Sequence, residues 1–337
     1  MISLLIVNYR SAGLAIDAIR TARLATHREL QIVVVDNSCD AQEAEFLRPH
    51  ADVVIAPPSN RGYAGGINEG RKECRGDAIV IANPDVAFAE GSIDALVDAL
   101  AYAAVAGPAL YWDEAHRWLL PPSDLHTTAG KADEVLASRS ATYARRRDRR
   151  RFFERVAFWS LTKPAKVRAL SGAVMAFHRD APPFDERFAL YFEETDFLRR
   201  IDGPIVYVSA ARVRHLYNQS AGQVSSEAAA RYVQSELKYL EKWSGPFAAR
   251  MLKSIERPPA TFHYEEIEGP LALDRDDVVL EASPLSNFAT AAGCLAPAAI
   301  DLPPDVLASW RGGPLYLRVV ERATGRIAGA WTRRIRP

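Results

Sequence analysis

The stretch SLLIVNYRSAGLAIDAIRTARLA, residues 3–25, joins a short apolar run to a segment with helical spacing. The run ends in polar residues, and apolar side chains then recur at Leu14, Ile16, Ile19 and Leu24. A second apolar, β-branched run, LQIVVVDNS at residues 30–38, follows closely. Buried strands that alternate with helices are typical of an α/β sandwich with a mainly parallel central sheet. We therefore predict this fold class for the first part of the chain.

The same alternation continues over the next seventy residues. DVVIAP (52–57) and GDAIVIANPD (76–85) are predicted strands, and GSIDALVDALAYA (91–103) is a predicted amphipathic helix. Ligands of such sheets bind at the carboxyl ends of the strands. Three of these ends are polar in this chain: Asn8-Tyr9, Asp36-Asn37-Ser38 and Asn83-Pro84-Asp85.

The composition is that of an ordinary globular protein. The chain has 337 residues, 48% hydrophobic and 25% charged, with a formal net charge of zero, so charge gives no argument for a nucleic-acid partner. The chain has three cysteines, Cys39, Cys74 and Cys294. Their odd number and the absence of CxxC spacing argue against a disulfide framework and against a cysteine zinc site. The N-terminal apolar run is too short for a signal peptide or a membrane span. We expect a cytoplasmic protein.

Two domains are predicted. Residues 1–250 form the α/β domain, and 251–337 form a small β-rich domain that covers an acceptor cleft, mediates a homodimer or binds glycan. A basic insert lies at about 139–168, with seven arginines between residues 145 and 155. One interpretation is a solvated helix or mobile loop. The other is a basic, aromatic-flanked surface that makes peripheral contact with anionic lipid head groups or meets a diphosphate-bearing acceptor.

The segment SNRGYAGGINEG, residues 59–70, is rich in glycine. Such a loop between a strand and a helix can bring backbone N–H groups close to a phosphate. It is neither a Walker loop nor the dinucleotide fingerprint. Alone, it is equally consistent with a tight connection.

Two carboxylates at strand ends are candidate ligands. Asp36 can accept a hydrogen bond from a base or a ribose, or it can cap a helix. Asp85 follows Pro84, whose ring stiffens the turn. Asp85 is either part of an ordinary turn or a ligand for a Mg²⁺ or Mn²⁺ ion, and this ion would also bind diphosphate oxygens.

A second acidic group lies in YFEETDF, residues 191–197. The carboxylates of Glu193, Glu194 and Asp196 repel one another. This repulsion costs free energy, which a bound cation or a role in proton transfer can compensate. They are interpreted either as a capping cluster at a helix start or as the source of a general base. His215 follows a predicted strand and is either structural or a ligand of the same metal.

In order, the motifs resemble the family 2 inverting glycosyltransferases with the GT-A fold, and most closely their bacterial rhamnosyltransferase-like branch. The motifs are LLIVNYRS, IVVVDNS, NRGYAGGINEG, GDAIVIANPDV, SGAVMAFHRD, FDERFALYFEETDFLRRI and RHLYNQSAG. Together they cover roughly residues 1–222.

The resemblance implies a role for each matching position. Asp85 and His215 would hold the metal, with Asn83 in place of the first aspartate of the family's Asp-x-Asp motif. Glu194 would be the catalytic base, with Glu193 and Asp196 as the alternatives. The nucleotide-sugar site would comprise Asn8, Tyr9, Asp36, Asn60, Arg61, Gly62, Gly66, Asn68, Asn83, Glu193 and Asp196.

The implied reaction is a metal-assisted single displacement. A sugar, with rhamnose favoured, would pass from dTDP-rhamnose or a UDP-sugar to a hydroxyl of a glycan or a lipid-linked acceptor. Two other classes stay open. One is a nucleotidyltransferase acting on a sugar phosphate, and the other is a non-catalytic nucleotide-sugar binding protein.

Overall fold

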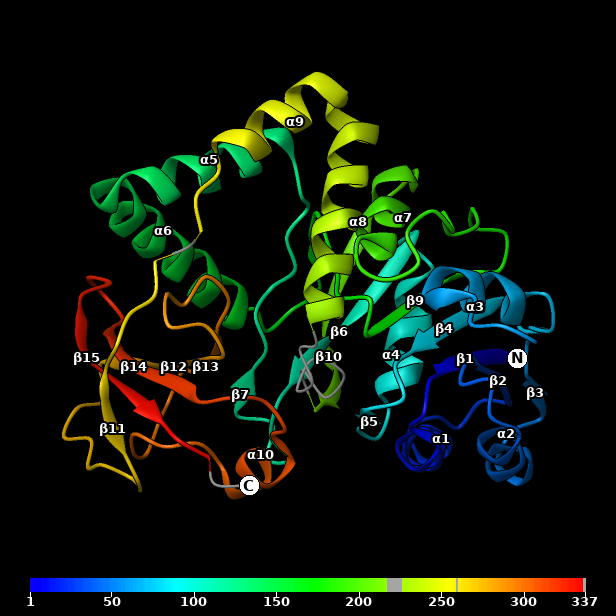
Figure 1. The fold of residues 1–337 in the computed structure, drawn as a ribbon. Coiled ribbons are helices and arrows are strands. Elements are labelled where there is room, and N and C mark those ends of the chain that lie inside the picture. Colours follow the sequence, from blue (N-terminus) through cyan, green and yellow to red (C-terminus); the bar gives the residue numbers. More distant parts are fainter. Residues whose placement is uncertain (217–225, 259, 336–337) are drawn as a thin grey trace. The chain divides into compact units, whose positions relative to one another are not determined.

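The computed structural model describes residues 1–216, 226–258 and 260–335 (Figure 1). The backbone packs into two compact units. Unit 1 comprises Met1–Leu110, Ser123–Leu125 and Thr162–His215, and unit 2 comprises Tyr111–Pro122, His126–Leu161 and Leu216–Pro337. The predicted division into domains 1–250 and 251–337 stays a prediction.

Unit 1 opens with the predicted strand and helix alternation. Parallel strands pair in the order β4-β1-β2-β3, with β1 (Ile2–Asn8), β2 (Leu30–Asp36), β3 (Val53–Ile55) and β4 (Ala78–Ala82). The elements between them are α1 (Ala12–Leu24), α2 (Ala41–Leu47), the short 3₁₀ helix η1 (Arg48–His50) and α3 (Gly62–Arg71). Strand side chains such as Leu4, Ile6 and Val80 pack with Ile19 of α1 in one core. Because β1 and β2 are in register to their last residues, Asn8 lies beside Asp36.

Beyond β4 the next two strand pairings of unit 1 are antiparallel, so the prediction of a mainly parallel sheet is wrong. After β5 (Val86–Phe88) and α4 (Ser92–Ala99), strand β6 (Val105–Tyr111) pairs antiparallel with β9 (Val174–His178), which pairs antiparallel with β4. Strand β10 (Ile205–His215) is antiparallel to β5 and to β8 (Ala165–Lys166). Unit 1 therefore has a mixed sheet. A buried strand has the same apolar pattern in either direction, so periodicity does not reveal this difference.

The glycine-rich segment is helical and not a loop, which corrects that prediction. Gly62, Gly66 and Gly70 recur every four residues on α3, so they lie on one face of the helix. A Cβ atom at Gly66 would lie 2.8 Å from Val7 Cγ1 of β1. Gly62 has a φ of +70°, and a Cβ there would lie 2.5 Å from the backbone oxygen of Ala189. These glycines allow close packing of the helix, which outweighs their low helix propensity.

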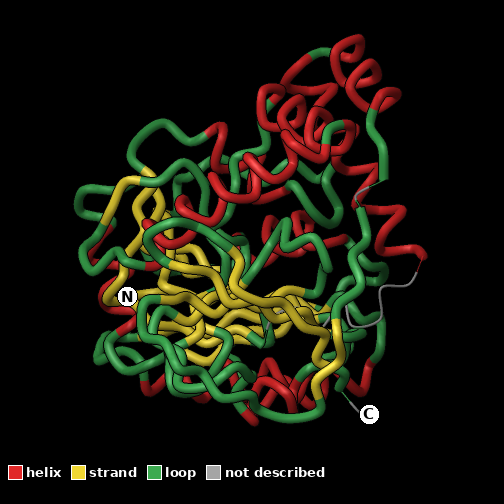
Figure 2. The backbone as a smooth tube through the Cα atoms, turned by 90° about the vertical axis from the view of Figure 1, so that its left-hand side faces the viewer, coloured by secondary structure: helices red, strands yellow, loops and turns green. Residues whose placement is uncertain are grey.

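Unit 2 combines a group of helices with a mostly antiparallel sheet, in which β11 and β15 pair parallel. The helices are α5 (Thr128–Arg139), α6 (Ala141–Trp159), α8 (Ser226–Ser244), α9 (Pro246–Ile255) and the short α10 (Pro304–Ser309). Strands pair in the order β11-β15-β14-β12-β13-β7, with β7 (Trp118–Leu119), β11 (Glu265–Ile267), β12 (Val278–Ser283), β13 (Ala292–Cys294), β14 (Leu315–Glu321) and β15 (Ile327–Arg333). Figure 2 marks strands in yellow and helices in red. The predicted β-rich character of the tail is confirmed.

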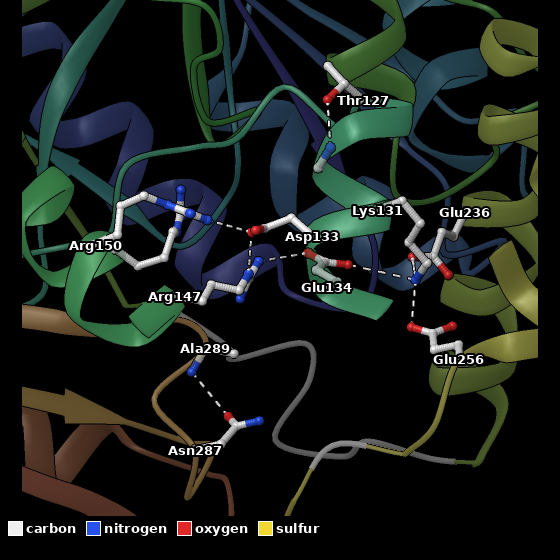
Figure 3. Close-up of polar contacts among 12 residues, drawn as sticks. Thr127, Lys131, Asp133, Glu134, Arg147, Arg150, Glu236, Glu256, Asn287 and Ala289 are labelled. Atoms are coloured by element: carbon white, nitrogen blue, oxygen red, sulfur yellow. Dashed lines mark hydrogen bonds and ion pairs between the residues drawn. The ribbon is translucent and has the colours of Figure 1, made fainter. Parts of the chain in front are cut away.

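Helix α6 contains the arginine-rich stretch, and several of its arginines are paired within unit 2. Arg147 and Arg150 both contact the carboxylate of Asp133 on α5, at 2.6 and 2.7 Å (Figure 3). Deeper in the unit, Arg155 donates from Nε to Glu281 Oε1 of β12 at 2.7 Å. The stretch is therefore not simply a solvated charge run.

Two general properties of the described residues bear on location and chemistry. All three cysteines are free thiols, with Cys39 exposed and Cys74 and Cys294 buried. Among the helices in the described ranges, none is both long and apolar enough to cross a membrane.

Candidate functional site

The carboxyl ends of β1 and β2 are joined by the side chain of Asn8. Its amide nitrogen donates to Asp36 Oδ1 and to Glu43 Oε2, both at 2.9 Å, and its oxygen accepts from Ser11 at 2.9 Å. Asn8 is fully buried. All of its hydrogen-bonding groups are thus engaged in fixing these two strand ends and the start of α1.

Asp36 and Tyr9 differ sharply in exposure. The Asp36 carboxylate is buried and accepts from the backbone N–H of Ser38 at 3.1 Å and from its hydroxyl at 2.7 Å. Tyr9, at the end of β1, is 53% exposed, with the Arg10 guanidinium carbon 5.5 Å from its ring centre. Tyr9 therefore offers an accessible ring for stacking.

The start of α3 is fixed by two asparagines. The oxygen of Asn60 accepts from the backbone N–H of Gly62 at 2.8 Å, and the amide of Asn37 donates to the backbone oxygen of Gly62 at 2.8 Å. Asn37 is buried, and its own backbone N–H donates to Asn8 at 2.8 Å. We did not predict a role for Asn37, although its place directly after Asp36 could have suggested one.

Arg61 and Asn68 both contact the segment before the acidic motif. Asn68 donates to the backbone oxygen of Phe184 at 2.9 Å and accepts from its N–H at 2.9 Å. Asn68 also donates to Glu186 Oε1 at 3.0 Å, while Arg61 lies 3.5 Å from the other oxygen of Glu186. Helix α3 and residues 184–186 are thus held together by side chains that the sequence assigns to the nucleotide pocket.

Asp85 and His215 are brought together by strand pairing. Val86 of β5 is in register with His215 at the end of β10. His215 Nε2 lies 3.3 Å from Asp85 Oδ1, and both side chains are almost buried. Burial works to raise the pKa of Asp85, but the charge of His215 and a hydrogen bond from it outweigh burial and lower this pKa. Nearby, the backbone N–H of Asn83 donates to Ala173 at 2.8 Å.

The Asp85–His215 pair fits a divalent cation only as part of its coordination shell. It offers one carboxylate oxygen and one imidazole nitrogen, both of which are ligand types for Mn²⁺. Within the ranges that the structure describes, no group of three or more His, Cys, Asp or Glu side chains could hold a metal ion. A cation bound at this pair would need further oxygens from its ligand and from water.

The acidic motif begins helix α7 (Glu193–Arg200) after a strained turn. Tyr191 and Phe192 have φ values of +68° and +69°, which are unusual for bulky residues. Such strain persists where surrounding structure enforces it and is often found at functional sites. Here Phe192 is buried and directly precedes the two glutamates.

The three acidic side chains of this motif lie in different environments. Asp196 is fully buried and accepts from Arg200 Nε at 2.8 Å. Glu193 is 5% exposed, and burial, followed by the charge of Glu194, raises the pKa of Glu193 well above 4.5. Glu194 is half-buried and accepts from the Thr195 hydroxyl at 3.2 Å. Glu194 is thus the most accessible of the three.

Tyr63 of α3 is influenced by the acidic groups. Its hydroxyl donates to the backbone oxygen of Gly172 at 3.0 Å. Burial of that hydroxyl raises the pKa of Tyr63, and the negative charges of Glu193, Glu194 and Asp85 raise it further. Asp85 and the acidic motif therefore act on the same hydroxyl group. We did not predict this tyrosine, because nothing in a glycine-rich run marks an aromatic residue as central.

Gly172 connects Tyr63 with Glu194. A Cβ atom at Gly172 would lie 3.1 Å from Glu194 Cβ and 3.2 Å from its Cγ. The glycine thus leaves the space that the Glu194 side chain occupies. Gly172 belongs to the SGAVMAFHRD motif, but only the structure reveals its contact with Glu194.

Every predicted site residue lies in unit 1. The structure pairs Asp85 with His215 and places Tyr63 and Glu194 against the same glycine, Gly172. Asn8, Asp36 and the start of α3 form a strand-end region. The last residues of the RHLYNQSAG motif, from Tyr217 onward, lie outside the described residues.

Part of the sequence matches a known protein family. Residues 3–168 match the family described as glycosyl transferase family 2. The chain is 28% identical over 253 residues to N-acetylglucosaminyl-diphospho-decaprenol L-rhamnosyltransferase of Mycobacterium tuberculosis, in both strain CDC 1551 / Oshkosh and strain ATCC 25618 / H37Rv. The match covers 66% of this chain and 78% of the relative.

Solved structures that resemble this one are distant in sequence. The mannosyltransferase PcManGT from Pyrobaculum calidifontis, in complex with GDP-Man and Mn²⁺, has 13% identity and a TM-score of 0.48 over 74% of this chain and 69% of that one. Residues 1–349 of S. aureus TarS in complex with UDP have 13% identity and a TM-score of 0.42, over 68% and 64% of the two chains.

Proposed function

The chain belongs to glycosyl transferase family 2, and from this premise we propose that it inverts the configuration of the sugar it transfers. The donor is a nucleotide-diphosphate sugar, with dTDP-rhamnose favoured and UDP-sugars next. The acceptor is a hydroxyl of a glycan or a lipid-linked glycan. Similarity to N-acetylglucosaminyl-diphospho-decaprenol L-rhamnosyltransferase supports rhamnose as the sugar and a lipid-linked glycan as the acceptor.

One observation carries this proposal. The backbone of Gly172 lies against the side chain of Glu194. The next residue, Ala173, accepts from the backbone N–H of Asn83, two residues before Asp85. A proton acceptor and a cation ligand therefore lie near each other at the carboxyl edge of the sheet. An inverting transfer needs both, because a hydroxyl loses its proton while a diphosphate leaves with added negative charge.

In the proposed mechanism, Glu194 acts as the general base. Its carboxylate takes the proton of the acceptor hydroxyl, whose oxygen forms a bond to the anomeric carbon of the donor. The bond from that carbon to the diphosphate oxygen breaks on the opposite face, and the nucleoside diphosphate keeps the electron pair. Burial and the raised pKa of Glu193 favour its protonated form. The burial of Asp196 and its ion pair with Arg200 support a structural role for it, in place of the predicted roles as sugar ligand or alternative base.

Asp85 and His215 are the proposed ligands of Mg²⁺ or Mn²⁺. The bound cation supplies charge stabilisation to the diphosphate of the donor. Because the pair offers only two protein ligands, we expect the affinity for the cation alone to be low and to rise when the donor supplies oxygens.

The nucleotide is proposed to bind over the ends of β1 and β2. The exposed ring of Tyr9 stacks on the base, and Asp36 contacts the base or the ribose. Arg61 contacts a phosphate, for which it must leave Glu186. The remaining proposed pocket residues are Asn8, Asn60, Gly62, Gly66, Asn68 and Asn83.

The products of the reaction test this function. Incubation with nucleotide sugars and an acceptor is expected to release a nucleoside diphosphate. Release of pyrophosphate would instead indicate a nucleotidyltransferase. Donor binding without any turnover across a panel of acceptors would indicate a binding protein. A thermal-shift panel of nucleoside diphosphates and nucleotide sugars, with and without Mn²⁺, identifies the donor to use.

Asp85→Ala is expected to remove the dependence of donor binding on Mn²⁺. In the unaltered protein, Mn²⁺ should strengthen donor binding by about tenfold or more. Disturbing a metal site usually costs about 10- to 100-fold in metal affinity or activity, so the loss of the Asp85 carboxylate should be large enough to remove this effect. Titration calorimetry of the donor with and without Mn²⁺ measures this difference. Asp17→Ala, the same change at an exposed position of α1, should keep the full metal effect. A metal effect that survives in Asp85→Ala would exclude Asp85 as a ligand.

Gly172→Ala is expected to lower kcat by about tenfold while the KM for the donor stays nearly unchanged. The added methyl group would press on Glu194 Cβ and Cγ and displace them by a few tenths of an ångström. A displacement of about 1 Å in a reacting group can cost about 10²-fold, so this smaller one is expected to cost less. Steady-state kinetics separate the two constants, and circular dichroism checks the fold. Gly13→Ala, where a Cβ would meet nothing within 4 Å, is the matched control. Equal kcat in both variants would contradict the positioning role of Gly172.

A further inference from the structure

Helix α9 of unit 2 has an apolar face that the unit's own core does not use. Phe247, Met251 and Ile255 recur every four residues, and they are 81%, 47% and 38% exposed. The other side of the helix buries Ala249 and Leu252 against the unit. A surface helix normally turns only one apolar face inward, so this outer face points to an external contact.

Helix α6 presents a basic face in the same unit. Arg145, Arg146 and Arg149 are exposed, and within the described part of the chain none of them has an ion pair. Arg149 instead lies over the ring of Phe153, 5.8 Å from its centre. A cavity of about 640 Å³ opens on this face, lined by Arg146, Arg149, Arg150, Phe153, Glu154 and Ala157.

These two faces belong to one cross-linked group of helices. Lys131 of α5 is buried and contacts Glu236 of α8 at 2.6 Å and Glu256, directly after α9, at 2.7 Å (Figure 3). At the far end of α5, Arg139 Nε donates to the backbone oxygen of Ile255 at 2.8 Å. Because α6 begins two residues after Arg139, the C-terminal end of α9 and the start of α6 meet at one corner of the unit.

We infer that this corner of unit 2 binds an anionic membrane surface, with α9 lying in the interface and α6 contacting the head groups. Helices with exposed aromatic and aliphatic side chains beside arginines bind such surfaces through apolar insertion and electrostatic attraction. The contact is peripheral, since no helix in the described ranges can cross a membrane. The inference does not depend on the proposed reaction.

A second copy of the chain fits this surface less well. A two-fold contact places the same patch on both subunits, so it would bring two sets of unpaired arginines, Arg145, Arg146 and Arg149 of each copy, into one interface. Anionic lipid head groups provide the opposite charge without such repulsion.

Sedimentation with vesicles tests the inference on the full chain. Binding is expected to vesicles containing one third phosphatidylglycerol, to weaken at high salt, and to be much lower on pure phosphatidylcholine. Arg146→Glu combined with Arg149→Glu should lower the partition coefficient about 30-fold or more, since each basic residue near an anionic surface contributes about fivefold. Phe247→Ser should lower it through the loss of apolar insertion.

Matched variants on unit 1 distinguish binding through this surface from a nonspecific effect of net charge or of exposed apolar side chains. Arg20→Glu with Arg23→Glu repeats the charge change on α1, and Phe46→Ser repeats the apolar change at a ring that is 67% exposed. Both controls should bind vesicles like the unaltered protein. Equal losses in controls and test variants would overturn the inference, as would equal binding to both vesicle types. Dimerisation in ultracentrifugation that Phe247→Ser abolishes, without vesicle binding, would overturn it in favour of a second copy.

Discussion

Replacing Glu194 with glutamine is expected to lower turnover by about 10²- to 10⁴-fold, the usual contribution of a general base, while donor affinity stays nearly unchanged. Glutamine keeps the size of the side chain and can still accept from the Thr195 hydroxyl, but it cannot take a proton. Release of nucleoside diphosphate measures kcat, and titration of the donor without acceptor measures binding. Full turnover in Glu194→Gln would remove Glu194 from the proposed mechanism.

Glu193→Gln is the control that distinguishes the two adjacent glutamates. Burial and the charge of Glu194 raise the pKa of Glu193, which favours its protonated, neutral form. An amide resembles a protonated carboxyl group in size and charge, so this variant should retain most of its turnover. If Glu193→Gln lost activity while Glu194→Gln kept it, the base would be Glu193.

The parts of the site that follow buried strands could be predicted from the sequence. The runs before Asn8, Asp36 and Asp85 are apolar and end abruptly in polar residues. That pattern depends only on burial of the strands, so it can be recognised in the sequence before the fold is known. His215 was named from its position after a strand, but its 3.3 Å approach to Asp85 depends on the pairing of β10 with β5. A pairing across about 130 residues leaves no local trace in the sequence.

Local reasoning failed where tertiary packing decides the structure. Glycine propensity predicted a loop at residues 59–70, yet close approach to β1 makes glycine the fitting residue for a helix. The same closeness brings Tyr63 among the acidic groups, which the sequence does not indicate. Strand direction beyond β4 also depends on distant pairing, which periodicity does not encode.

The arginines of α6 illustrate a further limit. Arg155 looks like a member of an exposed basic run, but its carboxylate partner, Glu281, lies 126 residues further along the chain. Arg318 then bridges Glu281 and Asp148, with contacts of 2.7 to 2.9 Å. Although burial opposes its charge, Glu281 and Asp148 raise the pKa of Arg318 above its ordinary value. Charge patterning cannot separate such buried arginines from the exposed ones beside them.

Glu281→Met is expected to lower the free energy of unfolding of unit 2 by about 3–5 kcal/mol, the usual cost of breaking a buried ion pair from one side. The Glu281 side chain is fully buried and Arg155 is 1% exposed. Both terminal nitrogens of Arg155 lack a hydrogen-bond partner among the described residues, so removal of Glu281 leaves this charge buried without a carboxylate. A loss below about 1 kcal/mol would mean that solvent already screens these charges.

Tryptophan fluorescence in urea measures this effect selectively. All six tryptophans lie in unit 2, so the fluorescence signal follows that unit alone. Donor binding, which we assign to unit 1, is then an independent measure of whether the other unit stays folded in Glu281→Met. Retained donor binding at a urea concentration that unfolds the tryptophan-bearing unit would also support independent folding of the two units.

Combining Arg155→Met with Glu281→Met should restore most of the lost stability, to within about 1–2 kcal/mol of the unaltered protein. The double variant removes both charges of the pair, and Arg318 keeps its two contacts with Asp148. The same urea titration completes the double-mutant cycle. If the double variant were less stable than both single ones, cavity formation rather than an unpaired charge would explain the loss. Recovery would instead mean that α6 and β12 are held together mainly by packing, with Glu281 needed because Arg155 is buried beside it.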